Sequence, residues 1–116
     1  MKHMKVAFSH KVQYYFGPLE GRESVDLSQT DFTDIAAIVI SETDTAILEN
    51  ETVKSFGIPI FLVVFDSSVD IDQFMGKVER VIDGSSTNFD LYKRQIEAAA
   101  DKYEESTLPP FFKALA

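Results

Sequence analysis

The sequence contains no cysteine and no tryptophan, and only two of its 116 residues are histidine. Without cysteine the chain forms no disulfides, and it cannot build a zinc finger or an iron–sulfur cluster, because these sites need thiolate ligands. Two histidines are also too few for a His-rich metal site. Stability must therefore come from a hydrophobic core, and a single domain of this length buries roughly two-thirds of its unfolded surface.

Positive charge is also scarce. Lysine and arginine together number 11 against 19 acidic residues, so the net charge is −8. Phosphate groups bind to basic protein surfaces, and this imbalance argues against DNA or RNA as a partner. The hydrophobic fraction of 45% is too high for a disordered chain. We therefore expect a folded domain with an acidic surface.

Long hydrophobic runs are absent. The longest are Ile35–Ile40 and Ile58–Phe65, the second interrupted by Pro59. Both are far shorter than the ~18 residues that a membrane-spanning helix needs. The first residues contain no apolar stretch long enough for a signal peptide. We therefore expect a cytoplasmic protein without membrane contact.

Five short segments have the composition of β-strands. Ile35–Ser41 and Ile58–Phe65 are apolar without alternation, which is typical of strands covered on both faces in a parallel sheet. Arg22–Leu27 alternates weakly and suits an edge strand. The predicted strands are Met4–Ser9, Arg22–Leu27, Ile35–Ser41, Ile58–Phe65 and Val78–Ile82.

Helical patterns lie between and after these strands. Gly57 suits a helix C-terminus, Asp70 and Asp72 suit a helix N-terminus, and Thr87 with Asp90 resembles a capping box. The predicted helices are Lys11–Phe16, Ile47–Phe56, Asp70–Lys77 and Thr87–Ser106, the last with apolar residues at three- and four-residue spacing. Segment 28–34 is too short for a crossover helix. The alternation predicts an α/β fold, a flavodoxin-like or receiver-like three-layer sandwich with a five-stranded parallel sheet.

Ligands of open parallel sheets bind at the carboxyl ends of the strands. The weak candidates for such a site are Ser9, His10, Ser41, Asp66 and Ser67. A phospho-receiver needs a carboxylate cluster for Mg²⁺ and an acceptor aspartate, but Ser9, His10 and Ser41 occupy those positions. No G-x-G-x-x-G, Walker A or G-x-S-x-G motif is present. We predict no catalytic, cofactor-binding or metal residue in this chain.

Two glutamates, Glu104 and Glu105, fall at the C-terminal end of the last predicted helix, where the helix dipole disfavours anions. We expect solvent exposure to accommodate them. The alternative is a basic partner in another segment or subunit.

The stretch 108–116 (LPPFFKALA) begins a new apolar pattern after two prolines that cannot continue a helix. It either packs back on the domain or forms part of a connection to a further domain. The predicted linker or interface residues are Leu108, Pro109, Pro110, Phe111, Phe112 and Leu115.

Three segments resemble the N-terminal domain of the bacterial ornithine/lysine/arginine decarboxylases: Asp31–Ile40, Phe56–Phe65 and Ile96–Leu115. The stretch 103–112, which contains Leu-Pro-Pro-Phe-Phe, is the most specific part, and residues 31–34 (DFTD) favour the ornithine branch. Residues 8–23 match nothing specific in that family.

The resemblance implies a wing domain over residues 1–107 and the start of a linker over 108–116. In that family the wing has a flavodoxin-like fold, carries no chemistry and helps catalytic dimers associate into larger homo-oligomers. The parent enzyme would convert L-ornithine to putrescine and CO2 in polyamine biosynthesis, using pyridoxal phosphate (PLP) on a lysine outside this chain. No lysine here matches that motif, so we expect no cofactor in these residues. The expected partners are the PLP domain of the same polypeptide and neighbouring subunits.

Three alternatives remain open. The chain could be the wing of a lysine or arginine decarboxylase. It could instead be a nucleotide- or small-molecule-sensing α/β domain that uses the strand ends, or a degenerate receiver that acts through protein contacts.

Overall fold

The computed structural model describes residues 4–86 and 89–107. All strand pairs are parallel, and the sheet has the order β2-β1-β3-β4-β5. The strands are β1 (Lys5–Phe8), β2 (Ser24–Asp26), β3 (Ile35–Ser41), β4 (Ile60–Val64) and β5 (Arg80–Asp83). The α-helices are α1 (His10–Phe16), α2 (Glu51–Phe56) and α3 (Asp90–Thr107), and the 3-10 helices are η1 (Leu27–Gln29), η2 (Thr45–Glu49) and η3 (Ile71–Phe74). The predicted α/β fold class and all five strands are confirmed.

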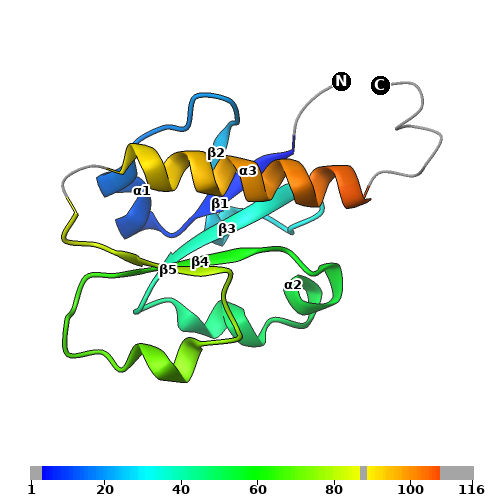
Figure 1. Cartoon of the computed structure of the whole chain (residues 1–116). Helices are drawn as coiled ribbons and strands as arrows, with labels where there is room; N and C mark the ends of the chain where they lie inside the picture. Colours follow the sequence, from blue (N-terminus) through cyan, green and yellow to red (C-terminus); the bar gives the residue numbers. More distant parts are fainter. Residues whose placement is uncertain (1–3, 87–88, 108–116) are drawn as a thin grey trace.

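The sheet separates two hydrophobic layers (Figure 1). Helices α1 and α3 cover one face, where Val12, Phe16 and Ile96 pack on β1 and β3. The elements η2, α2 and η3 cover the other face, where Leu48 and Val53 are buried. All seven residues of the central strand β3 are buried, which explains its unbroken apolar sequence.

The predicted helix Ile47–Phe56 is divided in two. Asn50 has an extended backbone, ends η2 and starts α2, and its Oδ1 accepts a hydrogen bond of 3.1 Å from the Val53 amide. Gly57 ends α2 in the left-handed conformation at φ 70°, as predicted. A local side-chain bond to the backbone therefore overrides the continuous helical pattern.

The predicted helix Asp70–Lys77 is only the short helix η3. Asp70 caps it by accepting a hydrogen bond of 3.0 Å from the Asp72 amide, as expected. The helix does not continue, because Met75 has an extended backbone and Gly76 lies at φ 84°. The crossover between β4 and β5 thus lacks a full helix, and Val64 and Val81 stay partly exposed. The predicted cap at Thr87 lies outside the described residues, and no helix of the described ranges is long and apolar enough to cross a membrane.

The guanidinium group of Arg22 connects distant parts of the chain. Its side chain is 2% exposed, and it donates hydrogen bonds to Asp101, to Glu104 Oε2 at 3.0 Å and to the Met4 carbonyl at 2.8 Å. Glu104 Oε1 accepts a further bond of 2.6 Å from the Met4 amide. We call Arg22, Asp101, Glu104 and the Met4 backbone the Arg22 cluster. It joins the loop before β2, the start of β1 and helix α3.

The Arg22 cluster explains the charge states of two buried groups, Glu104 and Arg22 itself. The expectation that solvent accommodates Glu104 is wrong, because this residue is 8% exposed and its basic partner is Arg22 of the same chain. Burial by itself lowers the pKa of Arg22, but the hydrogen bonds to Asp101 and Glu104 raise that pKa above its ordinary value. The guanidinium therefore remains charged in the folded protein.

Replacing Arg22 with methionine (Arg22→Met) should lower the free energy of unfolding by about 3 kcal/mol, because it removes the guanidinium that pairs with the buried Glu104 carboxylate. Urea denaturation followed by circular dichroism measures this loss. The control Lys54→Met breaks the exposed pair between Lys54 Nζ and Glu49, 3.0 Å apart, and should cost less than about 1 kcal/mol. Equal losses in the two variants would contradict the assigned role of Arg22.

Candidate functional site

The five residues predicted at the strand ends all lie along the carboxyl edge of the sheet. Ser9 follows β1, Ser41 ends β3, and Asp66 and Ser67 follow β4. Because β1, β3 and β4 are neighbours in the sheet, these residues lie on one side of the molecule, with His10 at the first turn of α1. The edge is therefore the first place to examine for a ligand site.

Most polar groups at this edge are engaged within their own loops. Ser41 Oγ lies 2.7 Å from Thr43 Oγ1 and donates a hydrogen bond of 3.1 Å to Asp44 Oδ2. Asp66 Oδ1 accepts bonds of 2.9 Å from the Ser68 amide and 2.7 Å from the Ser68 hydroxyl. These contacts stabilise the turns after β3 and β4 and direct the side chains into the loops.

The other three candidates differ in exposure, and Ser67 is exposed. The His10 side chain is 92% exposed, and its Nδ1 lies 4.0 Å from Asp26 Oδ2. Ser9 is buried, and its hydroxyl has no hydrogen-bond partner among the described residues. The five candidates thus share an edge but do not converge on one point, and their role as ligand contacts stays a prediction.

A repeated Asp-x-Ser/Thr pattern shapes this edge. In each copy one carboxylate oxygen accepts hydrogen bonds from the amide and the hydroxyl two residues later. The pairs are Asp26 with Ser28, Asp31 with Thr33, Asp66 with Ser68, and Asp83 with Ser85. These bonds hold the pKa of each aspartate below its usual range.

Three of these turns, at Asp26, Asp66 and Asp83, follow strands β2, β4 and β5, so ionised carboxylates line the carboxyl edge. Such an edge disfavours phosphate groups. Within residues 4–86 and 89–107, no three His, Cys, Asp or Glu side chains gather in a group that could hold a metal ion. This repeat was not among the predicted features, although the Asp-x-Ser/Thr spacing is visible in the sequence.

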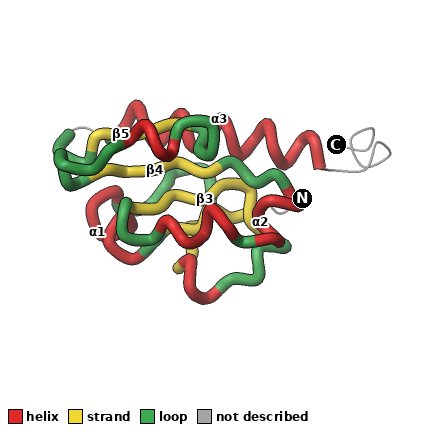
Figure 2. Tube along the Cα trace, turned by 90° about the horizontal axis from the view of Figure 1, so that it is seen from below, coloured by secondary structure: helices red, strands yellow, loops and turns green. Residues whose placement is uncertain are grey.

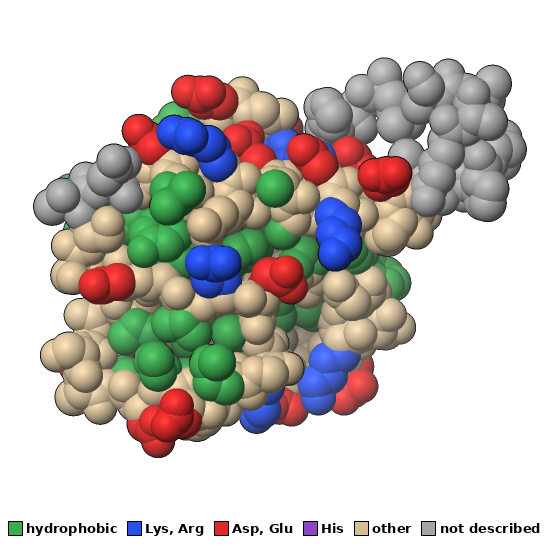
Figure 3. Space-filling model, viewed as in Figure 1, with side chains coloured by type: hydrophobic (Ala, Val, Ile, Leu, Met, Phe, Trp, Pro, Cys, Tyr) green, Lys and Arg blue, Asp and Glu red, His purple; other side chains and the backbone are tan. Residues whose placement is uncertain are grey.

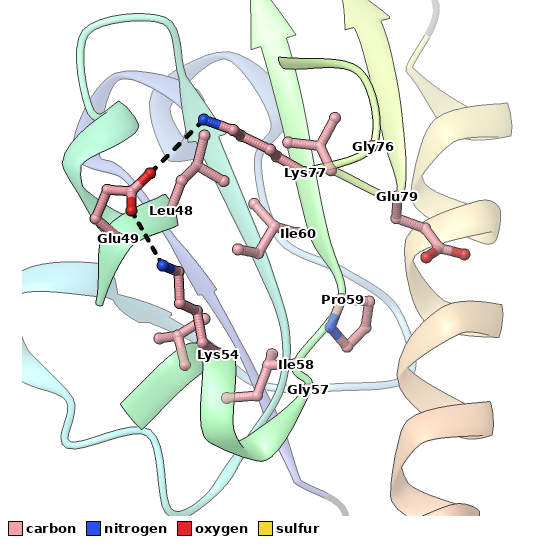
Figure 4. Close-up of a pocket in the computed structure, with 12 residues that line it drawn as sticks. Leu48, Glu49, Lys54, Gly57, Ile58, Pro59, Ile60, Gly76, Lys77 and Glu79 are labelled. Atoms are coloured by element: carbon pink, nitrogen blue, oxygen red, sulfur yellow. Dashed lines mark hydrogen bonds and ion pairs between the residues drawn. The ribbon is translucent and has the colours of Figure 1, made fainter. Parts of the chain in front are cut away.

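A cavity of about 580 Å³ lies at the opposite end of the sheet, beneath α2 (Figure 4). Its apolar wall includes Ile58 and Ile60. On its rim, Glu49 lies between Lys54 Nζ at 3.0 Å and Lys77 Nζ at 3.7 Å. The hydrogen bond from Lys54 is the main reason that the pKa of Glu49 lies below its ordinary value. Glu49 is therefore paired with both lysines of the rim. The sequence did not reveal this cavity, because three separate segments form it.

Hydrophobic side chains also gather on the surface below β5 (Figure 3). They surround a hollow of about 590 Å³ lined by Val64, Val69, Ile71 and Val81, where the crossover lacks a full helix. Ile71 is 42% exposed. This hollow offers apolar contact to another protein surface.

Aromatic side chains are exposed near the carboxyl edge, on helix α1. Tyr14 is 81% exposed and Tyr15 52% exposed, and the Tyr15 ring centroid lies 5.0 Å from that of Phe65. Lys11 Nζ lies 4.5 Å from the centroid of the Phe65 ring. Such a surface fits a protein contact better than a small polar substrate.

Replacing Ser28 with alanine should raise the pKa of Asp26 towards its ordinary value, because the Ser28 hydroxyl is the main group that lowers it. The Asp26 carboxyl carbon, followed by NMR during an acid titration, measures the shift. In the same spectra Asp83 should titrate unchanged, whereas the matched variant Ser85→Ala should raise the pKa of Asp83 alone. The Asp26 turn stabilises the fold only while its carboxylate is ionised, so this contribution is lost as the pH falls through the lowered pKa. An unchanged Asp26 titration in Ser28→Ala would refute this account.

Comparison with known proteins gives a consistent result. The family model for the Orn/Lys/Arg decarboxylase N-terminal domain matches residues 4–103. Ornithine decarboxylase of Haemophilus influenzae is 41% identical over 117 aligned residues, and inducible ornithine decarboxylase of a Lactobacillus species is 34% identical over 114. Constitutive ornithine decarboxylase of Escherichia coli is 34% identical over 117 aligned residues.

These alignments cover 100%, 97% and 99% of this chain but only 16%, 15% and 15% of the respective relatives. The similarity thus includes both ends of the described sheet and helix α3, and it agrees with the resemblance seen in the sequence. By fold and by sequence, the chain belongs to the family of N-terminal domains of ornithine/lysine/arginine decarboxylases.

Proposed function

We propose that this chain is the non-catalytic wing domain of a PLP-dependent ornithine decarboxylase, a carboxy-lyase that forms putrescine and CO2 from L-ornithine. The observation that carries the proposal is the match of the whole chain to 16% of an ornithine decarboxylase at 41% identity. The active site would then lie in the remainder of the polypeptide, which would be the first partner of this domain.

The ornithine branch is favoured over its two alternatives. The four curated relatives are all named ornithine decarboxylases, and residues 31–34 (DFTD) resemble that branch. The matching family description also includes lysine and arginine decarboxylases, so a wing from one of those enzymes is the second candidate.

The two lysines that line the cavity beneath α2 do not fit PLP. A lysine that forms an imine with PLP needs a lowered pKa, so that its amine is neutral. Lys54 lines the cavity beneath α2, but its hydrogen bond with Glu49 raises its pKa instead. Lys77 on the same rim lies 3.7 Å from Glu49 and is 56% exposed. These environments support a cofactor site elsewhere in the polypeptide.

We assign this domain a role in subunit assembly. The apolar hollow beside β5 and the exposed tyrosines of α1 are surfaces that a neighbouring subunit of a homo-oligomer would cover. Residues 1–107 would form the wing, and 108–116 would begin the linker to the PLP domain. With no membrane-spanning helix among the described residues, we propose a cytoplasmic enzyme.

The assembly role is tested in the complete polypeptide. Replacing the exposed Tyr14 and Ile71 with serine should shift the enzyme to smaller assemblies in sedimentation velocity, because both side chains lose apolar contact area. PLP absorbance should be retained, and ornithine decarboxylation should continue in the smaller species. The control Lys102→Ser changes an exposed residue outside both surfaces and should leave the assembly intact.

Two results would contradict the proposal. The first is an unchanged sedimentation coefficient in the Tyr14 and Ile71 variant. The second is CO2 release from L-ornithine by residues 1–116 alone with added PLP.

A further inference from the structure

A smaller cavity lies beside the cavity beneath α2, at the amino end of the sheet. Its volume is about 220 Å³, and the two cavities share Gly57, Pro59 and Glu79. The second half of α3 supplies the rest of its wall, including Ala99, Lys102 and Tyr103. Figure 2 shows α2 and the C-terminal end of α3 at the same end of the sheet. We call this space the α3 cavity.

Two side chains of opposite charge line the α3 cavity without partners. Glu79 precedes β5 and points towards α3 (Figure 4), and Lys102 lies on α3 itself. Neither side chain forms a hydrogen bond or an ion pair within residues 4–86 and 89–107, and the two do not pair with each other. Each charge is therefore available to a ligand group of the opposite sign.

The lysines of the neighbouring cavity are not available in this way. Glu49 already pairs with Lys54 at 3.0 Å and with Lys77 at 3.7 Å. A ligand carboxylate at those lysines would have to displace Glu49 and would lose the hydrogen bond from Lys54. Of the three lysines that line the two cavities, only Lys102 is unpaired in the described part of the chain. A free anion is therefore better accommodated in the α3 cavity.

The rest of the wall limits the size and the polarity of an occupant. Pro59, Ala99 and the Tyr103 ring provide apolar contact. Burial raises the pKa of the Tyr103 hydroxyl, so this group is a neutral hydrogen-bond donor at neutral pH. The volume of about 220 Å³ is smaller than the roughly 300 Å³ at which pockets for drug-sized ligands begin. The cavity therefore suits a small molecule with a short apolar part.

The two wall charges select among small molecules. A simple amine would be repelled by Lys102, and a simple carboxylate would be repelled by Glu79. A phosphate group would also meet Glu79, with a single lysine to offset the repulsion. A molecule that carries one ammonium group, one carboxylate and a short apolar chain matches every part of the wall. An α-amino acid with an apolar side chain has this combination.

We infer that the α3 cavity binds a free α-amino acid with an apolar side chain. The ammonium group lies at Glu79, the carboxylate lies at Lys102, and the side chain packs against Pro59 and Tyr103. This inference goes beyond the assembly role, because the α3 cavity includes neither the hollow beside β5 nor the exposed tyrosines of α1. It is also independent of which decarboxylase contains the domain, since only described residues form the site.

An NMR titration of the 116-residue chain with L-leucine and two matched analogues tests the inference. L-leucine should shift the amide signals of Gly57, Glu79 and Tyr103 saturably and leave those of residues 66–72, at the other end of the sheet, unchanged. Isocaproate lacks the ammonium group and isoamylamine lacks the carboxylate, so each should bind at least about threefold more weakly, having lost one exposed ion pair. No shift with L-leucine, or equal binding of all three compounds, would overturn the inference.

Neutralising each wall charge separates the two ends of the ligand. Glu79→Gln and Lys102→Gln should each weaken L-leucine binding by about threefold, and both residues are exposed, so the variants should fold normally. The matched controls Glu105→Gln and Lys93→Gln change the same residue types on α3 outside the cavity and should leave the affinity unchanged. Weaker binding in only one of the two cavity variants, or in neither, would overturn the inference.

Reversing one charge should change which compound binds best. Lys102→Glu makes both wall charges negative, so isoamylamine should then bind more tightly than L-leucine. The same titration measures this reversal and does not require that the variant lose binding altogether. An unchanged preference for L-leucine in Lys102→Glu would contradict the assignment of the ligand carboxylate to Lys102.

Discussion

The fold depends on one buried ion cluster. Arg22 is separated by 82 residues from Glu104, yet the two side chains meet at 3.0 Å, with the Met4 backbone bonded to both. About two turns of α3 before Glu104, Glu97 Oε1 accepts a bond of 2.7 Å from the Gly21 amide. The C-terminal helix is thus fixed on the sheet by charges as well as by its apolar face, and the loop before β2 has little freedom.

The two faces of the sheet differ in how much helix covers them. The α1 and α3 side is closed by an 18-residue helix, whereas the other side has the six-residue helix α2 and short 3-10 turns. The thin layer leaves hollows beneath α2 and beside β5. Such hollows are common where a domain contacts other parts of a larger protein. The unequal cover is the structural basis for assigning this domain a role in contacts rather than in chemistry.

Strands β3 and β4 were predictable from the sequence because their apolar runs are short, unbroken and rich in β-branched residues. The helices on the thin side were not, because single residues decide them: Asn50 divides one helix, and Gly76 stops another. Hydrophobic spacing is read over many residues at once, so it does not reveal where a single side-chain hydrogen bond or a single glycine ends a helix. The predicted parallel topology also placed Ser9 and Ser41 correctly at the carboxyl edge, because the carboxyl ends of parallel strands lie on the same side of the sheet.

The Arg22 cluster and the cavity beneath α2 could not be predicted in the same way. Ion pairs across 79 and 82 residues leave no periodic signal in one sequence, and Arg22 by itself resembles a surface residue at the start of an edge strand. The cavity beneath α2 requires the relative positions of η2, β4 and the segment before β5. Both features depend on tertiary packing, whereas the resemblance of 103–112 to the decarboxylase family is a property of the local sequence alone.

The position of Arg22 in the chain has a consequence for biosynthesis. A ribosome translates Arg22 82 residues before Glu104, which at roughly 5–20 residues per second is a delay of about 4–16 s. During this interval the nascent strand β1 has no α3 to cover it, and the guanidinium has neither carboxylate. The domain therefore closes late in its own translation, and a nascent-chain chaperone would find its apolar sheet accessible until the final helix emerges.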